Sequence, residues 1–358
     1  MYNLQLPVNT LSFGFCSLNI LRELYSRGKS ANVFLVQEPP DLGAYNFQED
    51  FLFWLSNSCA NSRAKYKVGD PSFRLWHING SENSIGEQVL FTFHETDTLT
   101  KSEINILQNQ KSVLVSSKYT KSVFEQHGVK NVVYCPLGFD SNHFKPLNFR
   151  KPPGLITFSL FGKWEHRKHT AKVIQSWVKK YGGNNSVVLN IHTYNPFASP
   201  EQNQQVLMAA LNGNRPPNVN PIPFVKTLKE LNEGINAADI VIDMSGGEGF
   251  SLPSFTALCL GKHGVIHNCS AMKDWAAEGG AVLVESKGKT PVYDNVFFRP
   301  GQQFNQGNIF SFDEDAFLAG CDAAIAKFRE NSVNEAGAKL PEKFSWKACV
   351  DTIEGQLQ

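Results

Sequence analysis

The sequence predicts an α/β protein made of two domains, and three observations lead to this fold class. Short apolar runs typical of buried strands alternate along the chain with segments of helical periodicity. The length of 358 residues suits two domains of ordinary size, each able to bury its own core. One apolar run, Ile240–Ile242, is followed by a glycine-rich turn and a helix start, as in many ligand-binding loops.

Composition narrows the class of protein. Hydrophobic residues make up 42% of the chain and 27 residues are phenylalanine, which indicates a globular protein. The net charge of +1 argues against a general affinity for polyanions. The seven cysteines form no Cys-x-x-Cys pair, which favours reduced thiols, a cytoplasmic location and no zinc site. We expect no membrane span and no signal peptide, because long apolar runs and a basic-then-apolar start are both missing.

The first half of the chain reads as strands joined by helices and loops. A strand over Leu4–Val8 precedes a turn of small residues, Asn9–Gly14, and a helix, Ser17–Ser26. His77 falls near the end of a strand, where ligands gather in open α/β sheets, so a functional role and a core role both stay open. The other expected elements are strands over Ala31–Val36, Phe73–Ile78, Val89–Phe93, Ser112–Ser116 and Asn131–Tyr134, and helices over Asp50–Ser58 and 118–128.

The second half repeats the pattern after a proline-rich linker, Leu147–Gly154. The stretch Val292–Asn308 has no readable pattern. Strands are expected over Ile156–Leu160, Val187–His192, Ile240–Ile242, Val265–His267 and Ala281–Val284, and helices over Thr170–Lys180, Gln202–Leu211, Thr227–Ala238, Ser254–Leu260, Asp274–Glu278, Phe312–Glu330 and Trp346–Leu357.

Acidic residues at one helix start resemble a metal-binding Asp-x-Asp. We interpret Asp313, Glu314 and Asp315 instead as carboxylates at a helix N-terminus, where they are favoured. Ser345 has the residue type and position of a cap for the last helix. No spacing of ligand-type residues points to a metal site.

Two loops carry residues suited to an anionic ligand. The turn Ser245–Gly249 offers backbone N–H groups at a helix start, and its Glu248 suits a hydroxylated ligand. Lys163, Arg167 and Lys168 cluster after another strand, where cations can clamp a diphosphate.

The sequence from Ser245 to Ala257 resembles the donor-site signature of family-4 retaining glycosyltransferases of the GT-B fold. The family pattern is roughly Ser-x-x-Glu-Gly-Phe-Gly-Leu-Pro, two residues, then Glu-Ala. This chain matches it up to Pro253, with serine at 251, and departs at Thr256, where the family has its second glutamate. Weaker matches follow the family order in Thr92–Thr100, Ser117–Thr120, Pro136–Asp140 and Phe144–Pro146.

The resemblance implies a GT-B architecture, in which two Rossmann-like domains face each other across a cleft. It implies an acceptor domain over 1–150, a nucleotide-sugar donor domain over 151–340 and a C-terminal helix, 341–358, that crosses back to the first domain. Phe344-Ser345-Trp346 fits the start of that helix.

The resemblance also implies roles for individual residues. Glu248, Lys163 and Lys168 would be catalytic, with Lys163 in place of a family arginine. Acceptor contacts are expected from Gly14, His77, His94 and Glu95 in the first domain. Donor contacts are expected from Arg167, Gly246, Gly247, Gly249, Phe250, Ser251, Leu252 and Thr256.

The implied function is transfer of a sugar from a nucleotide sugar, UDP- or GDP-linked, to a hydroxyl acceptor with retention of configuration, without metal or cofactor. A glycan or protein is the default acceptor. Hydroxylated DNA is an alternative, because Thr98–Lys130 has five lysines and two acids. The other alternative is a catalytically silent GT-B subunit that binds a glycan or a partner enzyme, which Thr256 favours.

Overall fold

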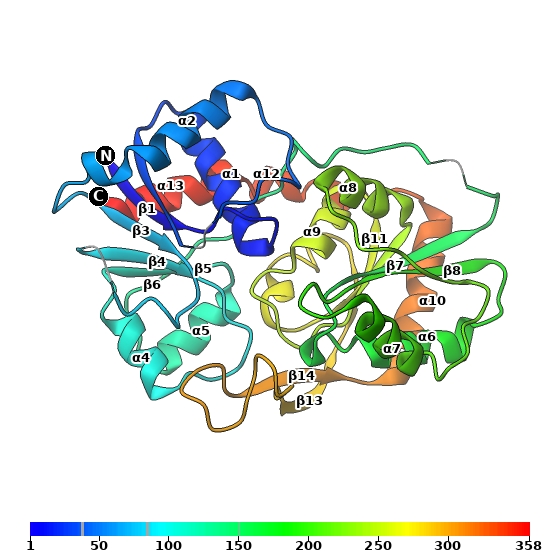
Figure 1. Cartoon of the computed structure of the whole chain (residues 1–358). Coiled ribbons are helices and arrows are strands. Elements are labelled where there is room, and N and C mark those ends of the chain that lie inside the picture. Colours follow the sequence, from blue (N-terminus) through cyan, green and yellow to red (C-terminus); the bar gives the residue numbers. More distant parts are fainter. Residues whose placement is uncertain (37–38, 84–85, 150) are drawn as a thin grey trace. The chain divides into compact units, whose positions relative to one another are not determined.

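The computed structural model describes residues 1–36, 39–83, 86–149 and 151–358 (Figure 1). The chain divides into two compact units. Unit 1 comprises Met1–His143, Gly301–Gln306 and Glu342–Gln358, and unit 2 comprises Phe144–Pro300 and Gly307–Pro341. Arg150, the last residue of the predicted first domain and part of the predicted linker, lies outside the described residues. Each unit holds a six-stranded sheet, which confirms the α/β class.

The sheet of unit 1 is parallel throughout, with strand order β2-β1-β3-β4-β5-β6. The order reverses at β1, since β2 pairs with one side of it and β3 with the other. Ligands of open α/β sheets bind at the carboxyl ends of strands at such a switch point. The strands are β1 Tyr2–Leu6, β2 Ala31–Leu35, β3 Ser72–Leu75, β4 Gln88–Thr92, β5 Ser112–Val115 and β6 Val132–Tyr134.

Helices cover both faces of this sheet (Figure 1). Ile106 and Phe124, from α4 and α5, pack in one hydrophobic cluster with Leu90 and Val113 of the sheet. In Figure 1, α1, α2 and α13 lie on the opposite side from α4 and α5. The helices of unit 1 are α1 Ser12–Ser26, α2 Glu49–Ala60, α3 Ser62–Lys65, α4 Lys101–Gln108, α5 Lys118–Gln126 and α13 Trp346–Leu357; α12, Leu340–Lys343, lies where the chain passes from unit 2 into unit 1.

The sheet of unit 2 is also parallel, with order β12-β11-β10-β7-β8-β9 and a switch point between β7 and β10. The antiparallel strands β13 and β14 flank the stretch without a readable pattern. The strands are β7 Ile156–Gly162, β8 Val187–Thr193, β9 Val219–Pro221, β10 Ile240–Asp243, β11 His263–His267, β12 Val282–Val284, β13 Ser286–Pro291 and β14 Asn308–Phe312. The helices are α6 Thr170–Tyr181, α7 Pro200–Ala210, α8 Leu228–Ala237, α9 Leu252–Cys259, α10 Glu314–Glu330, α11 Glu335–Ala338 and the 3-10 helices η1 His166–Lys168 and η2 Ser270–Asp274.

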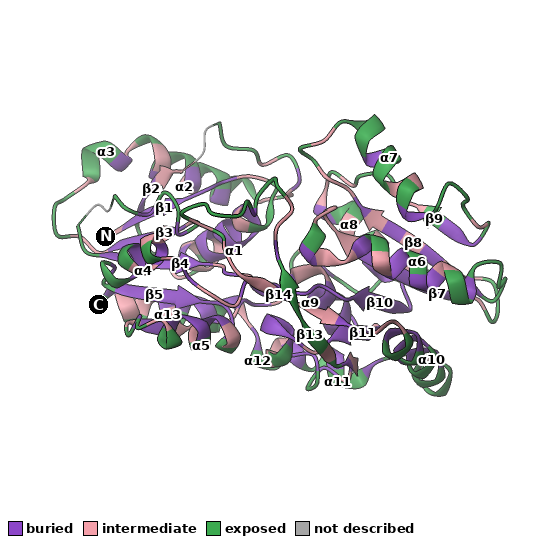
Figure 2. Ribbon diagram, turned by 90° about the horizontal axis from the view of Figure 1, so that it is seen from below, coloured by how far each residue is buried: buried purple, intermediate pink, exposed green. Residues whose placement is uncertain are grey.

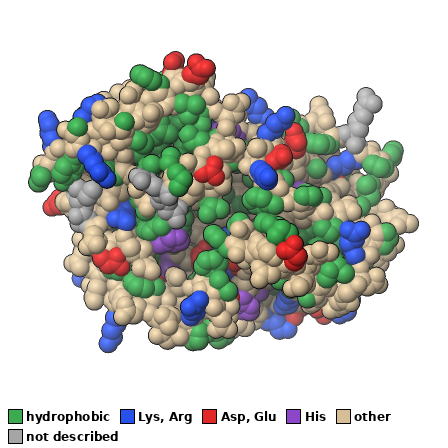
Figure 3. All heavy atoms as spheres, viewed as in Figure 1, with side chains coloured by type: hydrophobic (Ala, Val, Ile, Leu, Met, Phe, Trp, Pro, Cys, Tyr) green, Lys and Arg blue, Asp and Glu red, His purple; other side chains and the backbone are tan. Residues whose placement is uncertain are grey.

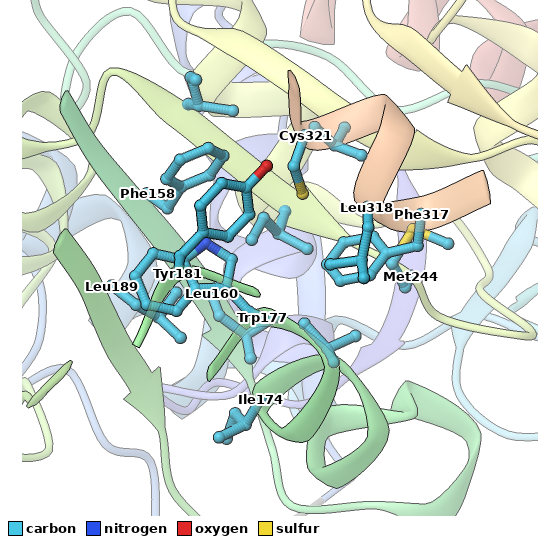
Figure 4. Close-up of a cluster of buried hydrophobic side chains, with 14 of the residues drawn as sticks. Phe158, Leu160, Ile174, Trp177, Tyr181, Leu189, Met244, Phe317, Leu318 and Cys321 are labelled. Atoms are coloured by element: carbon cyan, nitrogen blue, oxygen red, sulfur yellow. The ribbon is translucent and has the colours of Figure 1, made fainter. Parts of the chain in front are cut away.

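The core of unit 2 lies between its sheet and the helices α6 and α10 (Figure 4). Phe158 and Leu160 of β7 meet Trp177 of α6, while Phe317 and Cys321 enter from α10. Figure 2 shows the central strands of both units as buried. A strand buried on both faces appears in the sequence as a continuous apolar run. Such runs therefore predicted these central strands well.

Two of the expected helices differ most from the structure. Helix α1 starts at Ser12, five residues before the predicted start, because the side chain of Asn9 accepts the Leu11 N–H at 3.0 Å and orders the preceding turn. The helix expected over Asp274–Glu278 is wrong. The chain there forms η2 and a turn, since the buried Trp275 donates its indole N–H to the Phe250 carbonyl at 3.0 Å.

The C-terminal helix belongs to the first unit, as predicted. The Ser345 side chain caps α13 by accepting the Ala348 N–H at 3.2 Å. Arg27 of α1 pairs with Glu354 of α13 at 2.6 Å, and the Tyr2 hydroxyl donates to the same carboxyl group at 2.9 Å. These contacts attach the last helix to the first helix and first strand of unit 1.

Charge on the surface is mixed. On the face in Figure 3, Lys and Arg side chains are interspersed with Asp and Glu. Among the described residues, no helix combines the length and the apolar character needed to cross a membrane.

The close approach of α13 predicts the effect of a methyl group at Gly138. A Cβ there would lie 2.1 Å from the Trp346 nitrogen, so Gly138→Ala should lower the free energy of unfolding by about 1–3 kcal/mol, in the range of overpacked cores. The control is Gly355→Ala in α13, where no heavy atom lies within 4 Å and alanine should add about 0.5–1 kcal/mol. Urea unfolding measures both, and equal effects would contradict the predicted contact.

Candidate functional site

The switch point of unit 2 brings the two predicted ligand loops together. Strands β7 and β10 are hydrogen-bonded neighbours, with Leu160 beside Ile242. The basic loop, residues 163–168, follows β7. The glycine-rich turn, which in the structure comprises residues 245–251, follows β10. Both loops therefore leave the same edge of the sheet, side by side.

Two buried carboxylates pair with the three cations of the basic loop. The Oε1 atom of Glu248 lies 2.8 Å from Nη1 of Arg167 and 2.5 Å from Nζ of Lys168. Glu165 pairs with Lys163 and with Arg167, both at 2.8 Å. The side chains of Glu165, Glu248 and Arg167 are 5%, 8% and 7% exposed, so these pairs are largely shielded from water.

The pKa of Glu165 reflects this setting. Burial alone raises the pKa, because a charged carboxylate is poorly solvated inside the protein. The charges of Arg167, Lys163 and Lys168 outweigh burial and lower the pKa to about 2. Glu165 is therefore ionised in the folded protein.

Arg167 is engaged with the protein on several sides. Its Nη1 donates to the Gly247 carbonyl and to Glu248, both at 2.8 Å, and its own carbonyl accepts the Gly246 N–H at 2.7 Å. Arg167 joins the basic loop to the turn and holds the Glu248 carboxylate in place. Its contact with a ligand stays a prediction.

The turn offers fewer backbone donors than the sequence suggested. The Gly246 N–H is used by Arg167, and the Glu248 N–H donates to the Ser270 hydroxyl at 3.1 Å. The Gly247 N–H has no acceptor within the part of the chain that is described. Glycine is required at 246, because a Cβ there would lie 2.2 Å from the Phe310 carbonyl oxygen.

Lys168 and Lys163 remain the cations closest to solvent. Their side chains are 13% and 40% exposed. The ammonium group of Lys163 also lies 5.8 Å and 5.5 Å from the ring centres of the exposed Phe197 and Phe297. The side chains of these two lysines are therefore more accessible to an anion than that of Arg167.

The remaining predicted donor residues surround the end of the turn. The Phe250 side chain packs against Phe255 and Trp275, so it supports the turn from the core. Leu252, half-buried, begins α9, and Thr256 is buried within that helix. Ser251 has φ 66° and ψ 65°, a left-handed conformation that few non-glycine residues adopt. Gly249 lies in the turn next to Glu248.

The predicted acceptor residues fall in two places in unit 1. Gly14 lies in the first turn of α1, where a Cβ would be 2.1 Å from the Asn9 carbonyl oxygen. His77 follows β3 and is exposed rather than in the core, with its ring 4.5 Å from that of Phe13. Gly14 and His77 thus follow β1 and β3, the two strands at the switch point of unit 1.

His94 and Glu95 follow β4. His94 is buried and its Nε2 lies 3.0 Å from both the Thr98 carbonyl and the Thr96 hydroxyl. Burial lowers the pKa of His94, so the ring is neutral at pH 7. These contacts show that His94 orders its own loop, and its contact with an acceptor stays a prediction. Glu95 is half-buried.

Sequence reasoning missed Glu165 and Asp243. Glu165 is the lone acid among six basic residues between 163 and 180, a signal that it pairs with them. Asp243 ends the apolar run of β10, and its carboxylate accepts hydrogen bonds from Ser245, Ser251 and Ser254. An acid at the end of a buried strand is a recognisable sign of a local polar network.

Within the described ranges, no three His, Cys, Asp or Glu side chains are grouped so as to hold a metal ion. No protein-family model and no curated protein sequence matches the chain. Solved structures match over nearly its whole length. Sucrose-phosphate synthase from Thermosynechococcus elongatus aligns with a TM-score of 0.70 and 13% identity, covering 99% of this chain and 97% of that one.

Two further matches agree. Anabaena HepE in complex with UDP-glucose gives a TM-score of 0.66 and 14% identity, covering 100% of this chain and 99% of that one. WaaG, a glycosyltransferase involved in lipopolysaccharide biosynthesis, gives 0.62 and 9%, with all of both chains covered. The solved structures that this chain resembles are GT-B glycosyltransferases, and the chain has the GT-B fold that the turn motif implied.

The ion pairs of Glu165 predict an acid-sensitive stability. Its pKa is about 2 when folded and about 4.5 when exposed, so its contribution is complete above pH 4.5 and is lost as the pH falls toward 2. Glu165→Gln should therefore flatten the fall in unfolding free energy between pH 4.5 and pH 3, measured by urea titration. Glu233→Gln, at an exposed position on α8, is the control and should keep the wild-type slope.

Proposed function

We propose that this protein is a family-4-like glycosyltransferase that moves a sugar from a nucleotide sugar to a hydroxyl acceptor, with retention of anomeric configuration and without a metal ion. The observation that carries the proposal is the meeting of Lys163, Lys168 and Glu248 at the switch point of unit 2. The GT-B fold supports it, as does the UDP-glucose bound in the structure of HepE, a protein with the same fold.

The ligand-free ion pairs suggest how a donor binds. A diphosphate is a stronger partner for Lys168 than one shared carboxylate, because it carries more charge and more acceptor oxygens. When Lys168 turns from Glu248 to the diphosphate, Glu248 keeps its ion pair with Arg167. Glu248 then accepts hydrogen bonds from the sugar hydroxyls, while Arg167 keeps the carboxylate in position.

The same groups serve the chemical step. The departing diphosphate gains negative charge, which the fixed ammonium groups of Lys163 and Lys168 stabilise without proton transfer. Glu248 orients the sugar for attack. In the retaining route that the resemblance implies, the leaving phosphate oxygen takes the acceptor proton, so no protein base is assigned to that step.

The other unit provides the acceptor side in this proposal. Gly14 and His77 follow the strands at its switch point, where an acceptor glycan or protein would bind; hydroxylated DNA is a less favoured acceptor. We take 1–150 as the acceptor domain, 151–340 as the donor domain and 341–358 as the crossing helix, with UDP or GDP in the donor. The seven thiols, none in a disulfide, are consistent with the cytoplasm.

A second candidate function is a catalytically silent subunit that binds a glycan or a partner enzyme. Thr256 favours it, because the family places a glutamate there to hold the nucleotide ribose and a threonine offers only one hydroxyl. The internal pairing of Arg167 also favours it. An active enzyme with Thr256 has to hold the ribose through other groups.

Nucleotide sugars should raise the melting temperature of the purified protein. At about 100 times the Kd, a ligand specific for the folded state adds about 2.7 kcal/mol of stability. UDP-glucose, GDP-mannose, ADP-glucose and dTDP-glucose are tested in EDTA. Lys168→Ala and Glu248→Gln should weaken binding tenfold or more, whereas Lys179→Ala, at an exposed position on α6, should not.

Turnover then separates the two candidate functions. Incubation of the binding donor with a glycan mixture should give a product whose anomeric configuration, read by NMR, equals that of the donor. Inversion would reject the retaining mechanism, and loss of activity in EDTA would reject metal independence. If no nucleotide sugar shifts the melting temperature, the silent subunit becomes the better account.

A further inference from the structure

The carboxylate of Asp243 joins the two ends of the glycine-rich turn. Its Oδ1 accepts the Ser245 N–H at 3.1 Å and the Ser245 hydroxyl at 2.7 Å. Its Oδ2 accepts the Ser254 hydroxyl at 2.8 Å and the Ser251 hydroxyl. Ser245 begins the turn, Ser251 ends it, and Ser254 lies on the helix that follows.

These contacts require an ionised carboxylate. A carboxylate has about four acceptor positions and no donor, and all four positions are filled by donors here. Asp243 is buried, so it reaches no solvent that would replace a lost partner. The charge of Lys168 and the hydrogen bonds of the three serines keep the pKa of Asp243 below its usual value despite burial. An asparagine would present a donor where two hydroxyls need an acceptor.

Ser251 is the residue that most needs such a partner. Its φ of 66° places it in the left-handed region, which is unfavourable for a residue with a Cβ. Glycine would adopt this conformation without strain, and glycine is what the signature motif has at this position. In that conformation the Ser251 hydroxyl donates a hydrogen bond to Asp243.

We propose that Asp243 is a positioning residue that holds Ser251 left-handed and so fixes the turn that carries Glu248. Asp243 does not touch the ligand in this proposal. It acts on Glu248 through the two ends of the turn, whose middle residues are Gly246, Gly247 and Glu248. The support of Ser251 by Asp243 does not depend on any ligand, whereas the effect on ligand binding rests on the proposed function.

Thermal unfolding of single and double variants without ligand tests the structural part. Asp243→Asn should lower the melting temperature by roughly 5 °C or more, since buried hydrogen bonds are lost. In a Ser251→Gly background the same change should cost less than half as much, because glycine needs no support to stay left-handed. Ser254→Ala is the matched control: it also removes one hydrogen bond to Oδ2, but it relieves no backbone strain, so most of the cost should remain.

An equal reduction in the Ser251→Gly and Ser254→Ala backgrounds would overturn the proposal. If Asp243→Asn alone gives no folded protein, the double variants carry the same information. Recovery of folded protein with Ser251→Gly, but not with Ser254→Ala, supports the role of Asp243. Recovery with neither or with both rejects it.

Binding of UDP-glucose, measured by calorimetry well below the melting temperature, tests the link to Glu248. Asp243→Asn should weaken binding tenfold or more in the wild-type protein, whereas in a Ser251→Gly background the same change should weaken binding by less than about threefold relative to Ser251→Gly alone. Restored stability without restored affinity would reject the link. If the wild-type protein binds no UDP-glucose or other nucleotide sugar, the proposed function fails, while the unfolding measurements still decide the role of Asp243.

Discussion

The parallel pairing of β7 with β10 is the constraint on which the candidate site depends. The two strands are separated by about 80 residues of sequence, yet their hydrogen bonds place Leu160 beside Ile242. The candidate site in unit 2 depends on that register, because the loops that follow β7 and β10 leave the sheet at the same edge. The ion pairs of Glu248 with Arg167 and Lys168 form only because the loops meet there.

Charge balance is the second feature of the site. Three cations face three carboxylates, those of Glu165, Glu248 and Asp243, and the lowered pKa values of Glu165 and Asp243 keep both of these ionised. A site with unpaired cations would bind phosphate groups without selectivity. In the proposed function an anion has to compete with internal carboxylates, so a ligand that also offers hydroxyl groups to Glu248 would have an advantage over a simple anion.

Much of the fold follows from the sequence, because buried parallel strands leave apolar runs such as Ile240–Ile242 that are hard to mistake. Local signals also worked at helix ends. Ser345 caps α13 as predicted, and Asp313, Glu314 and Asp315 lie at the N-terminus of α10 as predicted, with Asp313 as its cap. Helix α4 was not predicted, although Thr100 and Glu103 have the residue types and spacing of the capping box that they form. The helix expected over Asp274–Glu278 failed for a different reason, since the packing of Trp275 overrides local preference.

The site was predicted in part. The motif located the two loops, and where they meet Lys168 pairs with Glu248, while Lys163 pairs with Glu165; the catalytic roles of these residues stay predictions. The partners of Arg167 and the burial of His94 were missed, because both depend on residues that are distant in sequence or on the local packing of a loop.

The contact of α13 with α1 has a consequence for how the chain folds during synthesis. Tyr2 and Glu354, which share a hydrogen bond, are 352 residues apart. Residues 1–143 of unit 1 are synthesised before unit 2, but helix α1 lacks its partner α13 until residues 342–358 have been made. Unit 2 therefore has all of its core strands available before unit 1 is complete.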